Sequence, residues 1–158
     1  QGTLISSENQ KEGFRAVAAK DGITTINIKS GRMLLAYGFL RAVFEVFERY
    51  KKPIDMIATS EVAVSLTVDN IDDLESIVEE LMAFGIVNIE TDLSIVSIVG
   101  LFPAEKPGYA GAIFDALRSI PVRMISYGGS ENNISVLVET KIKKETLLAL
   151  NKGLFQLD

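Results

Sequence analysis

The chain repeats itself once, at an offset of about seventy residues, and this duplication constrains the fold more than any other feature of the sequence. Three pairs of segments align between the two copies: residues 38–44 with 108–114, 53–57 with 121–125, and 64–68 with 134–138. Two copies are too few for a solenoid, which needs about three or more repeats to bury a continuous core. The sequence therefore predicts one small folded unit that is used twice.

Composition favours a globular protein without a membrane span. Hydrophobic residues make up 47% of the 158 residues, which is enough for a core. No apolar run reaches the ~18 residues that a membrane-spanning helix needs. The N-terminus lacks the pattern of a secretory signal, and the absence of cysteine fits a cytoplasmic protein. Residues 1–11 are polar and are predicted to form a linker, and the start at Gln1 without a Met suggests an excised fragment.

Several classes of function conflict with the composition. The net charge of −5 argues against a nucleic-acid partner. The chain has no histidine and no cysteine, which excludes imidazole and thiolate catalysis and most zinc sites. RNA-recognition domains present aromatic side chains on central strands, but residues 62–68 and 134–138 contain none. We therefore expect no catalytic residue, no metal and no cofactor in this chain.

Hydrophobic spacing predicts the order of elements in the first copy. Apolar residues at helical spacing indicate helices over residues 39–50 and 74–82, with Asn70 or Asp72 capping the second. Short apolar or alternating runs indicate strands over residues 23–28, 54–58, 62–68 and 87–91. The resulting order, β-α-β-β-α-β, is typical of a four-stranded antiparallel sheet with two helices on one face.

The second copy follows the same order but lacks its last strand. We expect strands over residues 95–99, 122–126 and 134–138, and helices over residues 109–120 and 143–150. The strand over residues 12–19, which the turn signal Asp21-Gly22 separates from the next one, has no partner in the first copy. We infer that this strand completes the second sheet.

The sequence therefore predicts an α+β protein of two ferredoxin-like units with antiparallel four-stranded sheets. Residues 20–92 form the first unit. Residues 93–158 together with strand 12–19 form the second unit, which is discontinuous in sequence. One face of each sheet stays open, so the units are expected to pack on each other or on a second chain.

One pair of residues suggests ligand chemistry. Gly38 lies at the entrance of the first helix, where free N–H groups can hold a carboxylate, and Asp55 could hold an ammonium group. Together they would clamp a free amino acid. The alternative is that Gly38 permits close packing and Asp55 is a surface charge. The second copy has Arg123 in place of Asp55, so a real clamp would exist in the first copy alone.

Two sequence elements at a specific separation resemble the regulatory region of aspartate kinase, which is built from paired ACT domains. The first is Gly38-Phe39-Leu40, and the second is Thr59-Ser60-Glu61-Val62, with Asp55 between them. Residues 123–128 and Asn133 resemble the matching strand and turn of the second ACT domain in that family. The resemblance covers nearly the whole chain.

This resemblance implies that an end-product amino acid, with lysine favoured over threonine, binds where ACT units of two chains meet. Binding would control the phosphorylation of L-aspartate, for which the parent enzyme would use ATP and Mg in a catalytic domain outside this fragment. The fragment would form a homodimer through its ACT domains. The implied effector-binding residues are Met33, Gly38, Phe39, Leu40, Ile54, Asp55, Ser60 and Glu61.

Two other interpretations remain open from the residues alone. The chain could be a dimerisation module that binds no ligand. It could also be an enzyme of the acylphosphatase type, which requires an arginine in an anion-binding loop near an asparagine. The predicted strand order does not place Arg123 and Asn132 in that way.

Overall fold

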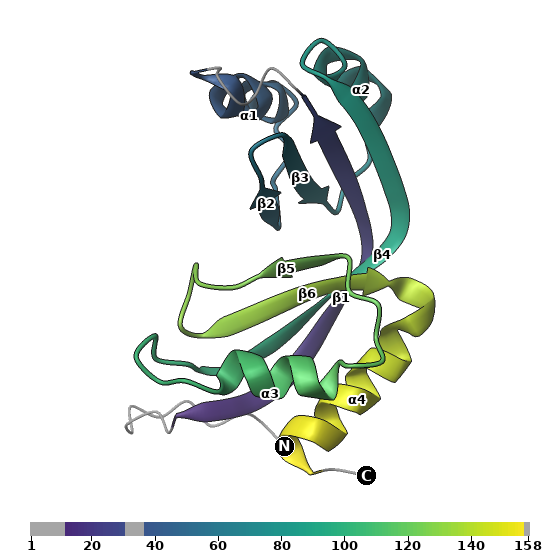
Figure 1. Ribbon diagram of the computed structural model, residues 1–158. Coiled ribbons are helices and arrows are strands. Elements are labelled where there is room, and N and C mark those ends of the chain that lie inside the picture. Colours follow the sequence, from purple (N-terminus) through teal and green to yellow (C-terminus); the bar gives the residue numbers. More distant parts are fainter. Residues whose placement is uncertain (1–11, 31–36, 157–158) are drawn as a thin grey trace.

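The computed structural model describes residues 12–30 and 37–156, whose strands form one antiparallel sheet with helices packed on it (Figure 1). The six strands lie in the order β2-β3-β1-β4-β6-β5. The strands are β1 (Gly13–Lys29), β2 (Ile57–Thr59), β3 (Ala63–Val68), β4 (Ile86–Leu101), β5 (Met124–Ser126) and β6 (Asn133–Glu139). The helices are α1 (Phe39–Arg49), α2 (Leu74–Leu81), α3 (Tyr109–Ala116), the 3-10 turn η2 (Thr140–Ile142) and α4 (Lys143–Phe155).

Two long central strands connect the two halves of the sheet. β1 pairs with β4 over nearly the whole length of both strands. The C-terminal part of β1 also pairs with β3, and the C-terminal part of β4 also pairs with β6. In Figure 1, α1, α2, β2 and β3 lie at the upper ends of β1 and β4, and α3, α4, β5 and β6 lie at their lower ends. We call these groups the first half and the second half.

The continuity of β1 and β4 corrects the predicted element boundaries. Two strands were expected around Asp21-Gly22, one on each side, and likewise two strands over residues 87–91 and 95–99; the members of each pair were assigned to two separate sheets. Instead, Gly22 (φ 73°) and Asp92 (φ 58°) lie within continuous strands, where the pairing of β1 with β4 shifts register around residues 20–25. A residue with positive φ can occur in a β-bulge as well as in a hairpin turn. Here Gly22 and Asp92 lie in bulges, where the two paired strands bend but do not reverse direction.

Each half buries its own apolar cluster between the sheet and two helices. The first cluster includes Ile26 and Leu66 of the sheet, Phe47 of α1 and Leu81 of α2. The second cluster combines β4 and β6 with α3 and α4. A third cluster, on the face without helices, lies where the halves meet: Ile23, Met56, Leu93, Ile95, Met124 and Leu137. The edge strands β2 and β5 contact each other there, so the sheet is curled.

The strand expected to complete the second sheet is the N-terminal part of β1, which pairs with β4 in the second half of the one sheet. Val17 of β1 faces Ile98 of β4, and Phe14 and Val17 pack against the second cluster. No helix in the described part of the chain is long and apolar enough to cross a membrane.

Smaller differences from the predicted boundaries have local causes. β2 begins at Ile57 and not at residue 54, because the pairing is irregular before it: Asp55 and Met56 both bond to Thr67, the Asp55 N–H to its carbonyl and the Met56 N–H to its hydroxyl at 2.8 Å. Asp73 precedes α2 as its N-cap without a side-chain cap bond, whereas the Asn70 side chain accepts from the Asp72 N–H. The helix predicted over residues 109–120 ends at Ala116, and the last helix continues to Phe155.

Close backbone packing at Gly85 gives a test of this fold. A Cβ atom at Gly85 would lie 2.2 Å from the carbonyl oxygen of Lys29, so the backbone must shift to admit it. Gly85→Ala is expected to destabilise the chain by about 1–3 kcal/mol. Gly111→Ala is the matched control, because Gly111 lies in α3 with nothing within 4 Å of the added Cβ. It should stabilise by about 0.5–1 kcal/mol. Urea unfolding measures both, and equal effects would contradict the predicted packing.

Candidate functional site

The N-terminus of α1 is an open end with free N–H groups. Gly38 is its N-cap, with φ 82°, a left-handed conformation that glycine adopts at low cost. Within the described residues, no side chain caps this helix, and its first turn carries no acidic residue. The first N–H groups of a helix have no partner inside the helix, and they carry the positive end of its dipole. This end can therefore accept a carboxylate.

The β2–β3 turn lies at the same end of the first half. Ser30, which follows β1, donates its backbone N–H to the Val62 carbonyl at 2.9 Å, and the Ser60 N–H donates to Ala63 at 2.9 Å. Phe39 stacks edge-on against Phe84, with 6.2 Å between ring centroids, beside the contact of Gly85 with Lys29. The structure thus brings five of the predicted residues to one end, which we call the α1 end: Gly38, Phe39, Leu40, Ser60 and Glu61.

Ile54 and Asp55 lie at the opposite end of the first half. The Asp55 N–H donates to the Thr67 carbonyl, and Lys52, which follows α1, reaches Asn70 at 2.8 Å. Helix α1 is about 16 Å long, and the five residues from Asp55 to Ser60 span about 17 Å. The clamp of Gly38 and Asp55 therefore does not form within one chain. Met33 lies outside the described residues.

Asp55 is already paired with an ammonium group of its own chain. The Lys20 Nζ lies 2.7 Å from Asp55 and 2.8 Å from Asp69. The hydrogen bonds to Asp55 and then to Asp69 raise the pKa of Lys20, and Lys20 lowers the pKa of Asp69. Since the Lys20 side chain is about half exposed, solvent screens this cluster. The sequence predicted that Asp55 could hold an ammonium, but Lys20 was not recognised as a partner.

The second half carries the same cluster with altered charges. The duplication aligns Lys20 with Glu90, Asp55 with Arg123, and Asp69 with Glu139. Arg123 donates to Glu139 at 2.9 Å and lies 3.7 Å from Glu90. Lys141, and then Arg123, lowers the pKa of Glu139. The two copies are therefore not equivalent, and the alignment of residues 20 and 90 could have revealed this from sequence.

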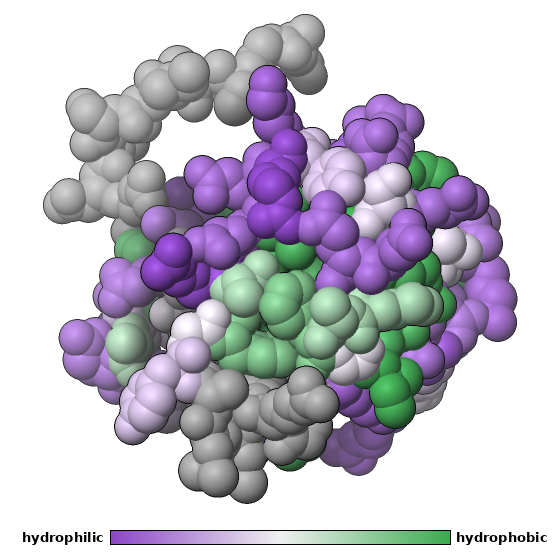
Figure 2. All heavy atoms as spheres, turned by 90° about the horizontal axis from the view of Figure 1, so that it is seen from above, coloured by the Kyte–Doolittle hydropathy of each residue, from purple (hydrophilic) through white to green (hydrophobic). Residues whose placement is uncertain are grey.

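Apolar side chains are exposed around the α1 end and along the adjacent edge strand. Figure 2 views the molecule from the side of α1 and α2 and shows apolar surface between hydrophilic side chains. Leu40, Ile57 and Val62 are 38%, 44% and 48% exposed. Exposed apolar side chains beside an edge strand with unpaired backbone groups favour contact with another chain.

Comparison with known proteins identifies the family. The ACT domain model matches residues 96–154. The aspartokinase of Schizosaccharomyces pombe is 38% identical over 157 residues, which cover 96% of this chain and 30% of the relative. A solved C-terminal regulatory domain of aspartate kinase from Porphyromonas gingivalis W83 is 51% identical, with a TM-score of 0.81 over 89% of this chain and 96% of that chain. The chain belongs to the regulatory ACT-domain family of the aspartate kinases.

This assignment confirms the resemblance seen in the sequence. The regulatory ACT domain spans only 30% of the length of its S. pombe relative. Escherichia coli aspartokinase III, solved in complex with lysine and aspartate in its T-state, is 34% identical, with a TM-score of 0.83 over 95% of this chain and 35% of that chain.

Removing Lys20 tests the cluster around Asp55. Asp69, whose pKa is held below its ordinary 3.8, stabilises the fold above that pH and loses this contribution as the pH falls through its lowered pKa. The raised pKa of Lys20 matters only at alkaline pH, above 10.5. Lys20→Met should therefore cost up to about 1 kcal/mol at pH 7 and almost nothing near pH 2. Urea unfolding at both pH values checks this, with exposed Lys144→Met as control. An equal loss of stability at pH 7 and pH 2 would contradict the ion pairs as the cause and would indicate that the aliphatic part of the lysine side chain stabilises the fold by packing.

Proposed function

We propose that this chain is the effector-binding region of an aspartate kinase. An end-product amino acid, with lysine favoured over threonine, would bind at the α1 end and control phosphorylation of L-aspartate by the catalytic domain of the whole enzyme, which would use ATP and Mg. The observation that carries this proposal is the likeness to E. coli aspartokinase III in complex with lysine and aspartate, over 95% of this chain. A cytoplasmic location stays a prediction.

We infer further that the two halves are two ACT units, residues 20–92 and residues 93–158 with strand 12–19. Two separate apolar clusters, each between sheet and helices, support this division. The shared strands β1 and β4 would transmit a displacement of one unit to the other. Residues 1–11 would link the units to the catalytic domain.

The proposed effector site needs a second copy of the chain. In one chain, Asp55 lies about 16 Å from the α1 end, which is too far for both to contact one amino acid. A two-fold homodimer through the β2 edges would bring Asp55 of one copy toward Gly38 of the other, and the exposed Ile57 of β2 and Val62 of the β2–β3 turn favour such a contact. The helix N-terminus would then hold the ligand carboxylate. Asp55 would exchange Lys20 for the ligand ammonium.

Such a site would regulate by a shift in populations. An amino acid held between two chains favours the arrangement of ACT units that it binds better, and only that difference in affinity moves the equilibrium. Coupling between an effector and a distant site is typically about 1–3 kcal/mol. The arrangement without ligand would then be the one in which the catalytic domain is active.

Calorimetry with L-lysine and L-threonine tests the site. Asp55→Ala should weaken lysine binding by about 1.5–3 kcal/mol, because it removes a charged hydrogen-bond acceptor. Asp115→Ala is the matched control, since the exposed Asp115 side chain of α3 pairs only with Arg118 among the described residues. Unchanged affinity in Asp55→Ala would remove Asp55 from the site.

Calorimetry together with sedimentation tests the second candidate, a dimerisation module without a ligand, which the exposed Leu40, Ile57 and Val62 favour. A chain that sediments as a dimer and shows no heat with either amino acid would support that module and contradict an effector site.

A further inference from the structure

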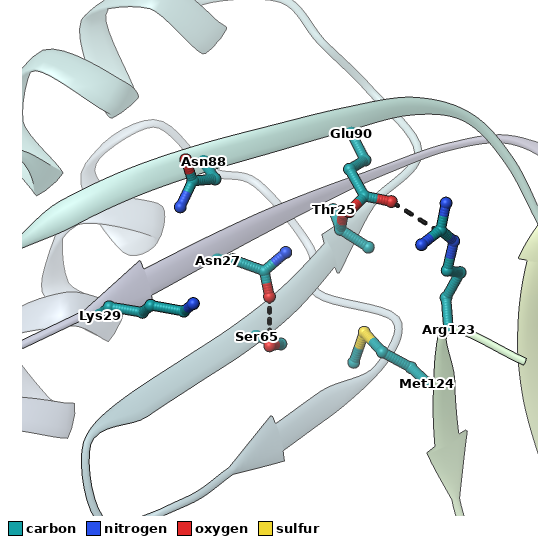
Figure 3. Close-up of a pocket in the computed structure, with 8 residues that line it drawn as sticks. All are labelled: Thr25, Asn27, Lys29, Ser65, Asn88, Glu90, Arg123 and Met124. Atoms are coloured by element: carbon teal, nitrogen blue, oxygen red, sulfur yellow. Dashed lines mark hydrogen bonds and ion pairs between the residues drawn. The ribbon is translucent and has the colours of Figure 1, made fainter.

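A cleft lies inside the curl of the sheet, on the face of the first half that carries no helix. Its volume is about 480 Å³, within the range of roughly 300–1,000 Å³ for small-molecule sites. β1, β3 and β4 supply one wall, and the beginning of β5 from the second half closes it (Figure 3). The lining residues are Thr25, Asn27, Lys29, Ser65, Asn88, Glu90, Arg123 and Met124.

One end of this cleft offers hydrogen-bond donors and a positive charge. Lys29 and Asn88 have no ion pair or side-chain hydrogen bond within the described residues, and both point into the cleft in Figure 3. Asn27 accepts a hydrogen bond from Ser65 through its carbonyl oxygen, which leaves its NH₂ group available. Asn27 and Asn88 face each other across the β1–β4 pair. This end fits a carboxylate.

The other end of the cleft offers an acceptor and a buried hydroxyl. Glu90 faces Thr25 across the same strand pair. Glu90 forms an ion pair with Arg123, whose Nε lies 3.7 Å away, too far for a hydrogen bond (Figure 3). Arg123 donates its hydrogen bond to Glu139, so the Glu90 carboxylate keeps room to accept one from a ligand. The Thr25 Oγ1 is buried without a hydrogen-bond partner among the described residues, and Thr25 is only 2% exposed. This end fits a ligand ammonium or hydroxyl group.

The second half shows that the fold does not require these polar residues. The duplication places Ile95, Ser97 and Val99 where the first half has Thr25, Asn27 and Lys29. It also places Ala18 where the first half has Asn88. The inner methionines, Met56 and Met124, occupy equivalent positions in the two halves and are both buried. The scaffold is therefore shared, and the donors and acceptors of the cleft belong to the first half alone.

We propose that this cleft is a second binding site, within a single chain, for a small zwitterionic metabolite of the amino-acid class. Lys29, Asn27 and Asn88 hold its carboxylate, and Glu90 and Thr25 accept from its ammonium group. Asn88 and Glu90 are two residues apart on one face of β4, about 7 Å, which an amino acid with a side-chain amine spans. Arg123 comes from the second half, whereas the other polar lining residues come from the first. A ligand in the cleft would therefore favour one position of the two halves relative to each other.

NMR titration of the ¹⁵N-labelled chain with L-lysine, L-threonine and L-methionine tests this site. At least one of the three is expected to cause saturable shifts in the amides of Thr25, Asn27, Asn88 and Glu90. Lys29→Met and Asn88→Leu should weaken this binding by about tenfold, as expected for a lost charge-assisted hydrogen bond. Lys144→Met, which changes an exposed lysine of α4, should leave it unchanged.

The α1 end provides an independent signal in the same spectra. Asp55→Ala should reduce shifts at Gly38 and Glu61 and leave those in the cleft, so the two sites can fail separately. The cleft proposal is overturned if none of the three amino acids shifts its amides, or if Lys29→Met leaves the shifts unchanged. It is equally overturned if the cleft amides shift with protein concentration alone, because a second copy of the chain then fills the cleft.

Discussion

The pairing of β1 with β4 holds the two halves of the molecule together. These strands are the only elements of the described chain that extend through both halves, and their backbone hydrogen bonds join the halves into one sheet. Bulges at Gly22 and Asp92 bend both strands at the same level. The bend brings β2 toward β5 and creates the third apolar cluster, with Met56 and Met124 on its two sides.

Duplication followed by divergence distinguishes the two halves at this junction. Lys20 bridges Asp55 and Asp69 in one copy, whereas Arg123 lies between Glu90 and Glu139 in the other. The sheet face without helices carries Thr25, Asn27 and Lys29 in the first half, whereas the aligned positions of the second half hold the smaller or apolar Ile95, Ser97 and Val99. A shared scaffold with unequal side chains suits a regulatory domain, because one copy can bind a ligand that the other does not bind, while the common strands couple the two copies.

Much of the fold could be predicted from local patterns. Helical spacing located α1, α2, α3 and α4, and the element order with its missing last strand indicated that the strand over residues 12–19 belongs with the second half. The Asp21-Gly22 signal was misleading, because a positive φ occurs in both a hairpin turn and a bulge. Only some of the predicted site residues lie close together in one chain. Gly38 and Glu61 lie at the α1 end, but Asp55 lies about one helix length away from them.

The duplication, the order of elements, the exclusion of histidine and cysteine chemistry, and the resemblance to aspartate kinase regulatory domains can all be read from the sequence alone. The ion pair of Lys20 with Asp55, and the cleft lined by Thr25, Asn27 and Lys29, become visible only in the folded chain. In sequence, these three alternate with the core residues of β1 and predict a solvent-facing side. The physical reason is that Arg123 and Met124 cover that face, and contacts between residues about a hundred positions apart leave no local pattern.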